Sequence, residues 1–191
     1  MILFHVCCAI CLSKSLAGYR KEIGLDPAKA GDLPAKGFFY NPNIHLLLEF
    51  RRRIKALSVY QERDPFPVEI DNEYGLTYFL DRIATGEQGR WGSPIRCAKC
   101  FAMRLQKTAE KAKAEGYEAF TTTLCASREQ NRDLLYVIGQ QVAEQVGIPF
   151  LWRDWRNEEP PSRWMNGVYR QQYCGCVFSE FDRYKGTGKW V

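Results

Sequence analysis

The sequence predicts an α/β protein in which a mostly parallel sheet is flanked by helices. Short apolar, β-prone runs alternate with longer stretches whose apolar residues recur at helical spacing. The connections between them are short and rich in Gly, Pro and Asn. This order is typical of strand–helix–strand units, whose strands lie parallel. The 191 residues are enough to bury a core, and we expect a single domain covering residues 1–191.

The first half of the chain contains three of the expected strands. Gly24 ends the helix that follows the first strand, and the Asn41–Asn43 turn ends the second strand. Asn43 is placed to cap the long helix behind it, whose apolar residues follow helical spacing. We expect strands at residues 2–6, 37–40 and 67–70, and helices at residues 12–23, 44–61 and 76–83.

The second half adds two strands and ends in a different kind of segment. We expect strands at residues 120–124 and 148–152, and helices at residues 97–114 and 133–146. Beyond them, residues 153–163 are charged and contain two adjacent prolines, which predicts a loop. Residues 164–191 form an irregular tail rich in aromatic side chains. We expect this tail to fold back over the core, because aromatic surface is costly to leave in water.

Composition and charge narrow the class of protein. With 46% hydrophobic and 26% charged residues, the chain has the composition of a soluble globular protein. No run approaches the ~20 apolar residues of a membrane helix, and Ile2–Val6 lacks the preceding basic residues of a signal peptide. We therefore expect a cytoplasmic protein with no membrane partner. The net charge of +5 is compatible with a nucleic-acid partner.

The cysteines carry the strongest chemical signal. Seven of the eight fall into three groups: Cys7 and Cys8 with Cys11, Cys97 with Cys100, and Cys174 with Cys176. In a reducing compartment such groups are ligands or catalytic thiols more often than structural disulfides. Adjacent cysteines fit zinc spacing poorly, whereas two pairs that meet in space would supply the four thiolates of a [4Fe–4S] cluster.

Each cysteine group has its own chemical possibilities. The C-x-x-C at Cys97–Cys100 stands at the expected start of a helix, where the helix dipole lowers thiol pKa values. The C-G-C at Cys174–Cys176 permits a strained, easily reduced disulfide that suits electron relay. Cys11 could be a spare ligand, a substrate-facing thiol or a buried apolar residue. Cys125 stands alone.

Polar residues follow several of the expected strands. Cys7-Cys8, Asn41, Asp71 and Ser127 come directly after strands, so they could face one cleft at the carboxyl edge of the sheet. Asp71 suits an acid, a base or a hard metal ligand, and equally a helix N-cap. We expect His5 to be a hydrogen-bonded core residue and His45 to face solvent.

Basic and aromatic residues suggest contact with RNA. Arg51–Arg53 and Lys55 form a basic run on a helix, which is usually a solvated face. Further arginines between residues 128 and 170 are interleaved with tryptophan and tyrosine, a mixture that suits stacking on bases and pairing with phosphates. The glycine-rich phosphate loops of nucleotide-binding folds are absent from the sequence.

Several blocks of residues, in order along the chain, resemble the QueH family of epoxyqueuosine reductases. They are His5-Val6-Cys7-Cys8-Ala9 with Cys11, Phe39–His45, Arg96-Cys97 with Cys100, Arg104 and Leu105, Phe120–Leu124 with Ser127, and Tyr173–Ser179. The resemblance implies a Rossmann-like fold of the adenine-nucleotide hydrolase type, without the nucleotide loop. The chain departs from the family pattern at Cys125, where we expect an aliphatic residue. We therefore interpret Cys125 as a packing thiol.

The resemblance also implies an activity and a set of roles. The reaction would be cobalamin-independent reduction of epoxyqueuosine to queuosine at the wobble position of tRNA, the last step of queuosine biosynthesis, with electrons from an unidentified donor. The implied cofactors are a [4Fe–4S] cluster and a second, mononuclear iron. By similarity, Cys174 and Cys176 would form a redox-active disulfide. Asp71 is our candidate ligand for the second iron, and we hypothesise that Asp71 or a nearby acid supplies a proton. The implied cluster ligands are Cys7, Cys8, Cys97 and Cys100.

Two other classes of protein also account for part of the pattern. A zinc-stabilised RNA-binding module without catalysis would explain the charge, the aromatic residues and the paired cysteines. It would not explain the adjacent cysteines or the C-G-C sequence. A thiol–disulfide oxidoreductase would explain the cysteine pairs, and its activity would survive complete removal of iron.

Overall fold

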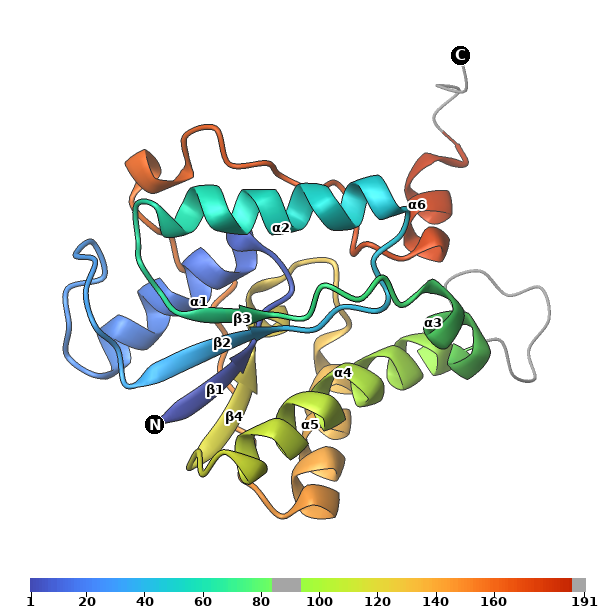
Figure 1. Cartoon of the computed structure of the whole chain (residues 1–191), viewed down its shortest axis with the longest axis horizontal. Coiled ribbons are helices and arrows are strands. Elements are labelled where there is room, and N and C mark those ends of the chain that lie inside the picture. The colour runs from blue at the N-terminus through green and yellow to red at the C-terminus, as the bar shows by residue number, and fades with distance from the viewer. Residues whose placement is uncertain (84–93, 187–191) are drawn as a thin grey trace.

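A four-stranded, fully parallel sheet forms the centre of the protein, and the expected α/β fold class is confirmed. The computed structural model describes residues 1–83 and 94–186 (Figure 1). The strand order is β3-β2-β1-β4, so the first strand lies inside the sheet. Phe4 of the first strand pairs with Gly37 on one side and with Thr121 on the other. The strands are β1 (Ile2–His5), β2 (Ala35–Phe39), β3 (Val68–Ile70) and β4 (Ala119–Thr122).

Helices cover both faces of the sheet. Figure 1 shows α1 and α2 on one side, and α4 and α5 on the other. Because β1 is covered on both faces, its residues Leu3 and Phe4 are fully buried, as is typical of a central parallel strand. The helices are α1 (Ala9–Glu22), α2 (Leu47–Gln61), α3 (Leu76–Ile83), α4 (Pro94–Ala114), α5 (Arg132–Val146) and α6 (Val177–Tyr184). Within the described ranges, every helix is too short or too polar to cross a bilayer.

Two expected elements differ in the structure. Helix α2 begins at Leu47 and is not capped by Asn43, which is buried three residues before Leu46, the N-cap residue. The expected strand at residues 148–152 is reduced to one parallel bridge between Phe120 and Phe150. Pro149 has no N–H to donate, so a continuous ladder cannot form there.

The C-terminal tail folds back over the core, as expected, because its residues Trp164 and Met165 are buried in the main core cluster. The segment before the tail is also anchored: the indole ring of Trp155 is buried and stacks on Phe4 with ring centroids 5.7 Å apart. It lies so close to α1 that a Cβ atom at Gly18 would be 2.2 Å from it. The tail is not irregular throughout, because it contains α6. The N-cap of α6 is Cys176, whose sulfur accepts the N–H of Ser179, and cysteine is not a residue from which a cap is recognised in a sequence.

Candidate metal and redox site

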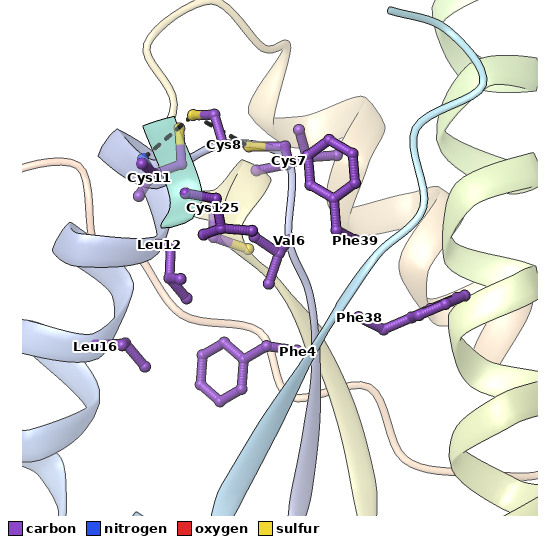
Figure 2. Packing of buried hydrophobic residues seen from close by; sticks show 14 of the residues in the cluster. Phe4, Val6, Cys7, Cys8, Cys11, Leu12, Leu16, Phe38, Phe39 and Cys125 are labelled. Atoms are coloured by element: carbon purple, nitrogen blue, oxygen red, sulfur yellow. Dashed lines mark hydrogen bonds between the residues drawn. The ribbon is translucent and has the colours of Figure 1, made fainter. Parts of the chain in front are cut away.

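Three cysteines meet where β1 ends and α1 begins. Cys8 is the N-cap of α1, and its sulfur accepts the backbone N–H of Cys11 at 3.4 Å. The Sγ atoms of Cys7 and Cys8 are 3.8 Å apart, and the three sulfurs of Cys7, Cys8 and Cys11 all lie within 4.8 Å of one another. Figure 2 shows these side chains together at the end of the apolar core that contains Phe4. Cys11, whose role the sequence left open, therefore belongs to this group.

The other two cysteine pairs share a cavity of about 350 Å³. Cys97 and Cys100 line it from the first turns of α4, and Cys174 and Cys176 line it from the loop before α6. The Sγ atoms of Cys174 and Cys176 are 3.7 Å apart, so the two are thiols rather than a disulfide. Only a small movement separates this dithiol from the oxidised form.

A buried arginine connects the thiols of the cavity to the end of β1. Arg104 is 2% exposed, and its Nη1 atom lies 3.8 Å from the Cys100 sulfur. Its Nη2 atom donates to the side-chain oxygen of Asn41 at 2.8 Å. Asn41 in turn donates to the carbonyl of Val6, also at 2.8 Å. Arg104 is therefore fixed between α4 and the turn that carries the first cysteines.

Arg104 has no carboxylate partner among the ion pairs of the described residues, and its Nε atom has no hydrogen-bond partner. A guanidinium buried in this way is unfavourable unless negative charge lies nearby. Its positive charge lowers the pKa values of Cys7, Cys100 and Cys174 and so favours their thiolate forms. Arg104 therefore affects one cysteine in each of the three groups. The surroundings of Arg104 therefore fit an anionic sulfur centre.

A second buried arginine holds the dithiol loop. The expectation that Arg53 is part of a solvated basic face is wrong, because its side chain is 2% exposed and pairs with Glu49 at 2.7 Å. Its two terminal nitrogens donate to the carbonyls of Cys174 and Tyr173 at 3.0 and 3.1 Å. Gly175 has φ +120°, and a Cβ atom there would lie 3.1 Å from both nitrogens. The glycine of the C-G-C sequence is therefore required by backbone conformation and by close packing.

Hydrogen bonds among the first three cysteines separate their pKa values. The bonds that Cys8 accepts from Cys11 and Cys7 hold its pKa well below the ordinary value, and Gln171 donates to the same sulfur at 2.8 Å. Hydrogen bonding with Cys11 lowers the pKa of Cys7, but the bond to Cys8 and burial outweigh it and raise that pKa to about 12. The bonds that Cys11 donates to Cys7 and Cys8 raise its own pKa. Binding of a metal here would therefore release protons.

The dithiol of the cavity is also asymmetric. The hydrogen bond from Cys176 lowers the pKa of Cys174 to about 6, with further help from the Cys176 N–H and the Ser179 hydroxyl, whose oxygen lies 2.9 Å from the Cys174 sulfur. The same bond raises the pKa of Cys176. Burial raises the pKa of Cys100 to about 11. Cys174 is thus the thiolate of the cavity at neutral pH.

Asp71 lies apart from the cysteine cavity. It follows β3 at the same edge of the sheet, and its carboxylate accepts the backbone N–H of Glu73 at 3.0 Å, so it does not cap a helix. It lines a separate surface hollow together with Lys107. The carboxylates that line the cysteine cavity are Glu129 and Asp182. The sequence did not single these out, because neither follows a strand directly.

The two histidines are both internal. His5 is fully buried with its ring nitrogens 2.8 Å from the Thr122 hydroxyl and 3.1 Å from the Tyr40 carbonyl, which confirms a hydrogen-bonded core histidine. The expectation that His45 faces solvent is wrong. It is fully buried, and its backbone N–H donates to the carbonyl of Gly175 at 2.8 Å. His45 therefore joins the start of α2 to the dithiol loop.

Part of the aromatic set is used inside the protein. Trp155 and Trp164 are buried and cannot stack on an exposed base, so the RNA interpretation is wrong for these two residues. Arg132 and Arg156 both pair with Asp154, at 2.7 and 2.9 Å, but their side chains lie at the surface. Contact of these arginines with RNA stays a prediction.

The fold and the site define a class: a parallel α/β protein that gathers cysteine thiols around two buried arginines at the carboxyl edge of its sheet. A family model described as epoxyqueuosine reductase QueH matches residues 2–182, and the chain belongs to this family of oxidoreductases. Proteins named epoxyqueuosine reductase QueH from Thermotoga maritima and Dehalococcoides mccartyi are 30% and 31% identical to it. These matches cover 95% and 96% of this chain, and 91% and 94% of the two relatives.

The low pKa of Cys174 predicts how the iron-free, reduced protein reacts with iodoacetamide. Because the thiolate is the nucleophile, alkylation of Cys174 should be slow below pH 6 and reach half its maximal rate near pH 6. Peptide mass spectrometry measures the rate at each pH. Ser179→Ala should move the midpoint upward, and Cys125, buried with a pKa raised by burial to about 12, serves as the unreactive control. A midpoint at the ordinary thiol value of about 8.5 would contradict the assignment.

Proposed function

We propose that this chain reduces epoxyqueuosine to queuosine at the wobble position of tRNA, the last step of queuosine biosynthesis. The observation that carries the proposal is the gathering of thiols around buried Arg104 in a member of the epoxyqueuosine reductase family. Removal of an epoxide oxygen to leave an alkene consumes two electrons and two protons and releases water. An electron donor must supply the electrons, and a tRNA substrate places the enzyme in the cytoplasm.

The thiols suit a [4Fe–4S] cluster held by Cys7, Cys8, Cys97 and Cys100. Thiolates are the ligands of such clusters, and Arg104 offsets negative charge where the sulfurs lie. When bound, the cluster would supply single electrons to the substrate. Cys11 is the alternative ligand, because its sulfur lies with those of Cys7 and Cys8.

The dithiol can supply the reducing power for one turnover. Oxidation of the Cys174 thiolate and the Cys176 thiol to a disulfide releases two electrons and one proton. One epoxide requires these two electrons and two protons, and the second proton comes from a cavity carboxylate. Because its pKa is low, Cys174 is already a thiolate when this step begins. Arg53 holds the loop that carries Cys174. The dithiol must then be reduced again before the next turnover.

The cavity offers groups that suit a modified base. The guanidinium of Arg96 lies over the ring of Phe178, 4.3 Å from its centroid, and Gln130 and Asn131 line the same cavity. Planar and amide side chains of this kind hold unstacked bases through stacking and hydrogen bonds. We propose that the epoxyqueuosine base enters here.

Removal of a cluster ligand tests the metal assignment. After anaerobic reconstitution, the wild type should contain about four iron and four sulfide ions, and Cys7→Ala should lose most of both. Cys11→Ala should keep them, with Cys125→Ala as the control for loss of a buried thiol. Queuosine formation on epoxyqueuosine-containing tRNA, measured by nucleoside mass spectrometry, should follow the iron content.

Three outcomes would contradict this account. Undiminished iron and sulfide in Cys7→Ala would remove Cys7 from the ligand set. Stoichiometric zinc without iron or sulfide would favour the RNA-binding module. Activity that survives complete removal of iron would favour a thiol–disulfide oxidoreductase.

A second experiment identifies the acid. The family resemblance suggests Asp71 as proton donor or as ligand of a mononuclear iron, whereas Glu129 and Asp182 line the cavity itself. We propose that the proton comes from a cavity carboxylate. Glu129→Gln or Asp182→Asn should lower kcat by roughly 10²–10⁴-fold, the range for loss of a general acid, and Asp71→Asn should stay within a few fold. The opposite result would return the role to Asp71, and iron counts would show whether it binds metal.

A further inference from the structure

The first turns of α2 carry an apolar and basic surface. Leu46 and Leu48 are 63% and 65% exposed, and Arg51, Arg52 and Lys55 are exposed on the following turns. Arg51 and Arg52 come three and four residues after Leu48, and Lys55 comes four and three residues after them, so all four share one face of the helix. Adjacent exposed leucines rimmed by charged residues are typical of protein interaction sites. We call these five residues the Leu–Arg surface.

The Leu–Arg surface adjoins the backbone of the dithiol loop. Leu46 follows His45, whose N–H donates to the carbonyl of Gly175 at 2.8 Å. Arg53, about two turns further along α2, donates to the carbonyl of Cys174 at 3.0 Å. Figure 1 shows this end of α2 next to α6, which begins directly after the loop. The first half of α2 and the residue before its N-cap are therefore hydrogen-bonded to the backbone of the dithiol loop, at Cys174 and Gly175.

The sulfurs themselves face another way. Cys174 and Cys176 line the cavity shared with Cys100 and Arg104, whereas Gly175 packs against Arg53. A partner on the Leu–Arg surface would thus meet the backbone of the loop and not its sulfur atoms. Such a partner cannot exchange disulfides directly, so it would act by transferring electrons to the dithiol.

The positive charge of the Leu–Arg surface indicates that its partner is acidic. Arg51, Arg52 and Lys55 contribute three positive charges, while the acidic residue in the first turn of α2, Glu49, is buried against Arg53. Positive charge of this kind attracts an acidic protein and speeds its association. Two leucines more than half exposed suit a protein surface better than a phosphate backbone.

We propose that the Leu–Arg surface docks an acidic iron–sulfur protein that reduces the Cys174–Cys176 disulfide. This proposal rests on the proposed function, which requires the dithiol to be reduced after each turnover. Two carriers, or one carrier twice, each lose one electron. The disulfide takes up these two electrons and one proton from solvent, and becomes the Cys174 thiolate and the Cys176 thiol. Electron-transfer encounters of this type bury little surface, which fits a docking site limited to two turns of one helix.

Two variants remove the two parts of the surface. Leu46→Ser with Leu48→Ser removes the apolar part and gives α2 a serine at its N-cap, where no side-chain bond exists at present. Arg51→Glu with Arg52→Glu reverses the charge and places a glutamate four residues before Lys55, a favourable helix pair. Neither change should unfold the protein.

Matched controls lie elsewhere on the protein. Leu25→Ser removes an exposed leucine, 45% exposed, from the segment between α1 and β2. Lys29→Glu with Lys36→Glu reverses two exposed charges in the same segment and at the beginning of β2. These controls carry the same chemical changes without touching the Leu–Arg surface.

The experiment compares two reductants on the same proteins. An acidic [2Fe–2S] ferredoxin, kept reduced, serves as the docking donor, and dithionite serves as a small donor that needs no docking. Queuosine formation is measured with each. With the ferredoxin, the charge-reversal variant should be at least about tenfold slower at low salt and lose its salt dependence. The leucine variant should also be several-fold slower, and both should stay within about twofold of the wild type with dithionite.

Each other result has a definite meaning. Wild-type rates with the ferredoxin in both variants would overturn the docking proposal, as would a wild type that accepts no electrons from it. A higher KM for tRNA with dithionite would show that the surface binds RNA instead, and a change in oligomeric state would show that it binds a second copy. No queuosine from the wild type with dithionite would overturn the proposed function itself.

Discussion

The arrangement of the site depends on one buried positive charge. Arg104 reaches from α4 to the end of β1, where Asn41 accepts one of its hydrogen bonds and itself holds the carbonyl of Val6. No carboxylate pairs with it among the described ion pairs, so sulfur must supply the negative charge that makes its burial favourable. The parallel sheet makes this possible, because the chain leaves β1 and β2 at the same edge.

A second buried arginine, Arg53, holds the backbone of the loop that carries the dithiol. Arg53 fixes the carbonyls on the loop, and the sulfurs are left facing the cavity. The cavity side of the dithiol and its backbone side are thereby different surfaces of the protein. In the proposed reaction, this division would let the substrate and the reducing partner reach the same redox pair without displacing each other.

The sequence predicted the parallel α/β fold and the importance of the three cysteine groups, because strand periodicity and cysteine spacing are local signals. The positions of the buried charges are not local signals. Arg53 stands within a basic run that reads as solvated, and only its spacing of four residues from Glu49 hints at a buried pair. His45 was misplaced for a similar reason, since its burial depends on Gly175, which is distant in sequence. Helix α6 was missed because its cap is a cysteine.

The most direct test measures how much iron loading stabilises the protein with and without Arg104. Urea unfolding under anaerobic conditions gives the free energy of unfolding of the iron-free and the iron-loaded forms. The account predicts that loading stabilises the wild type and Arg104→Lys more than it stabilises Arg104→Met, because methionine fills the space without offsetting the charge of the sulfur centre. An equal gain on loading in Arg104→Met and the wild type would contradict it.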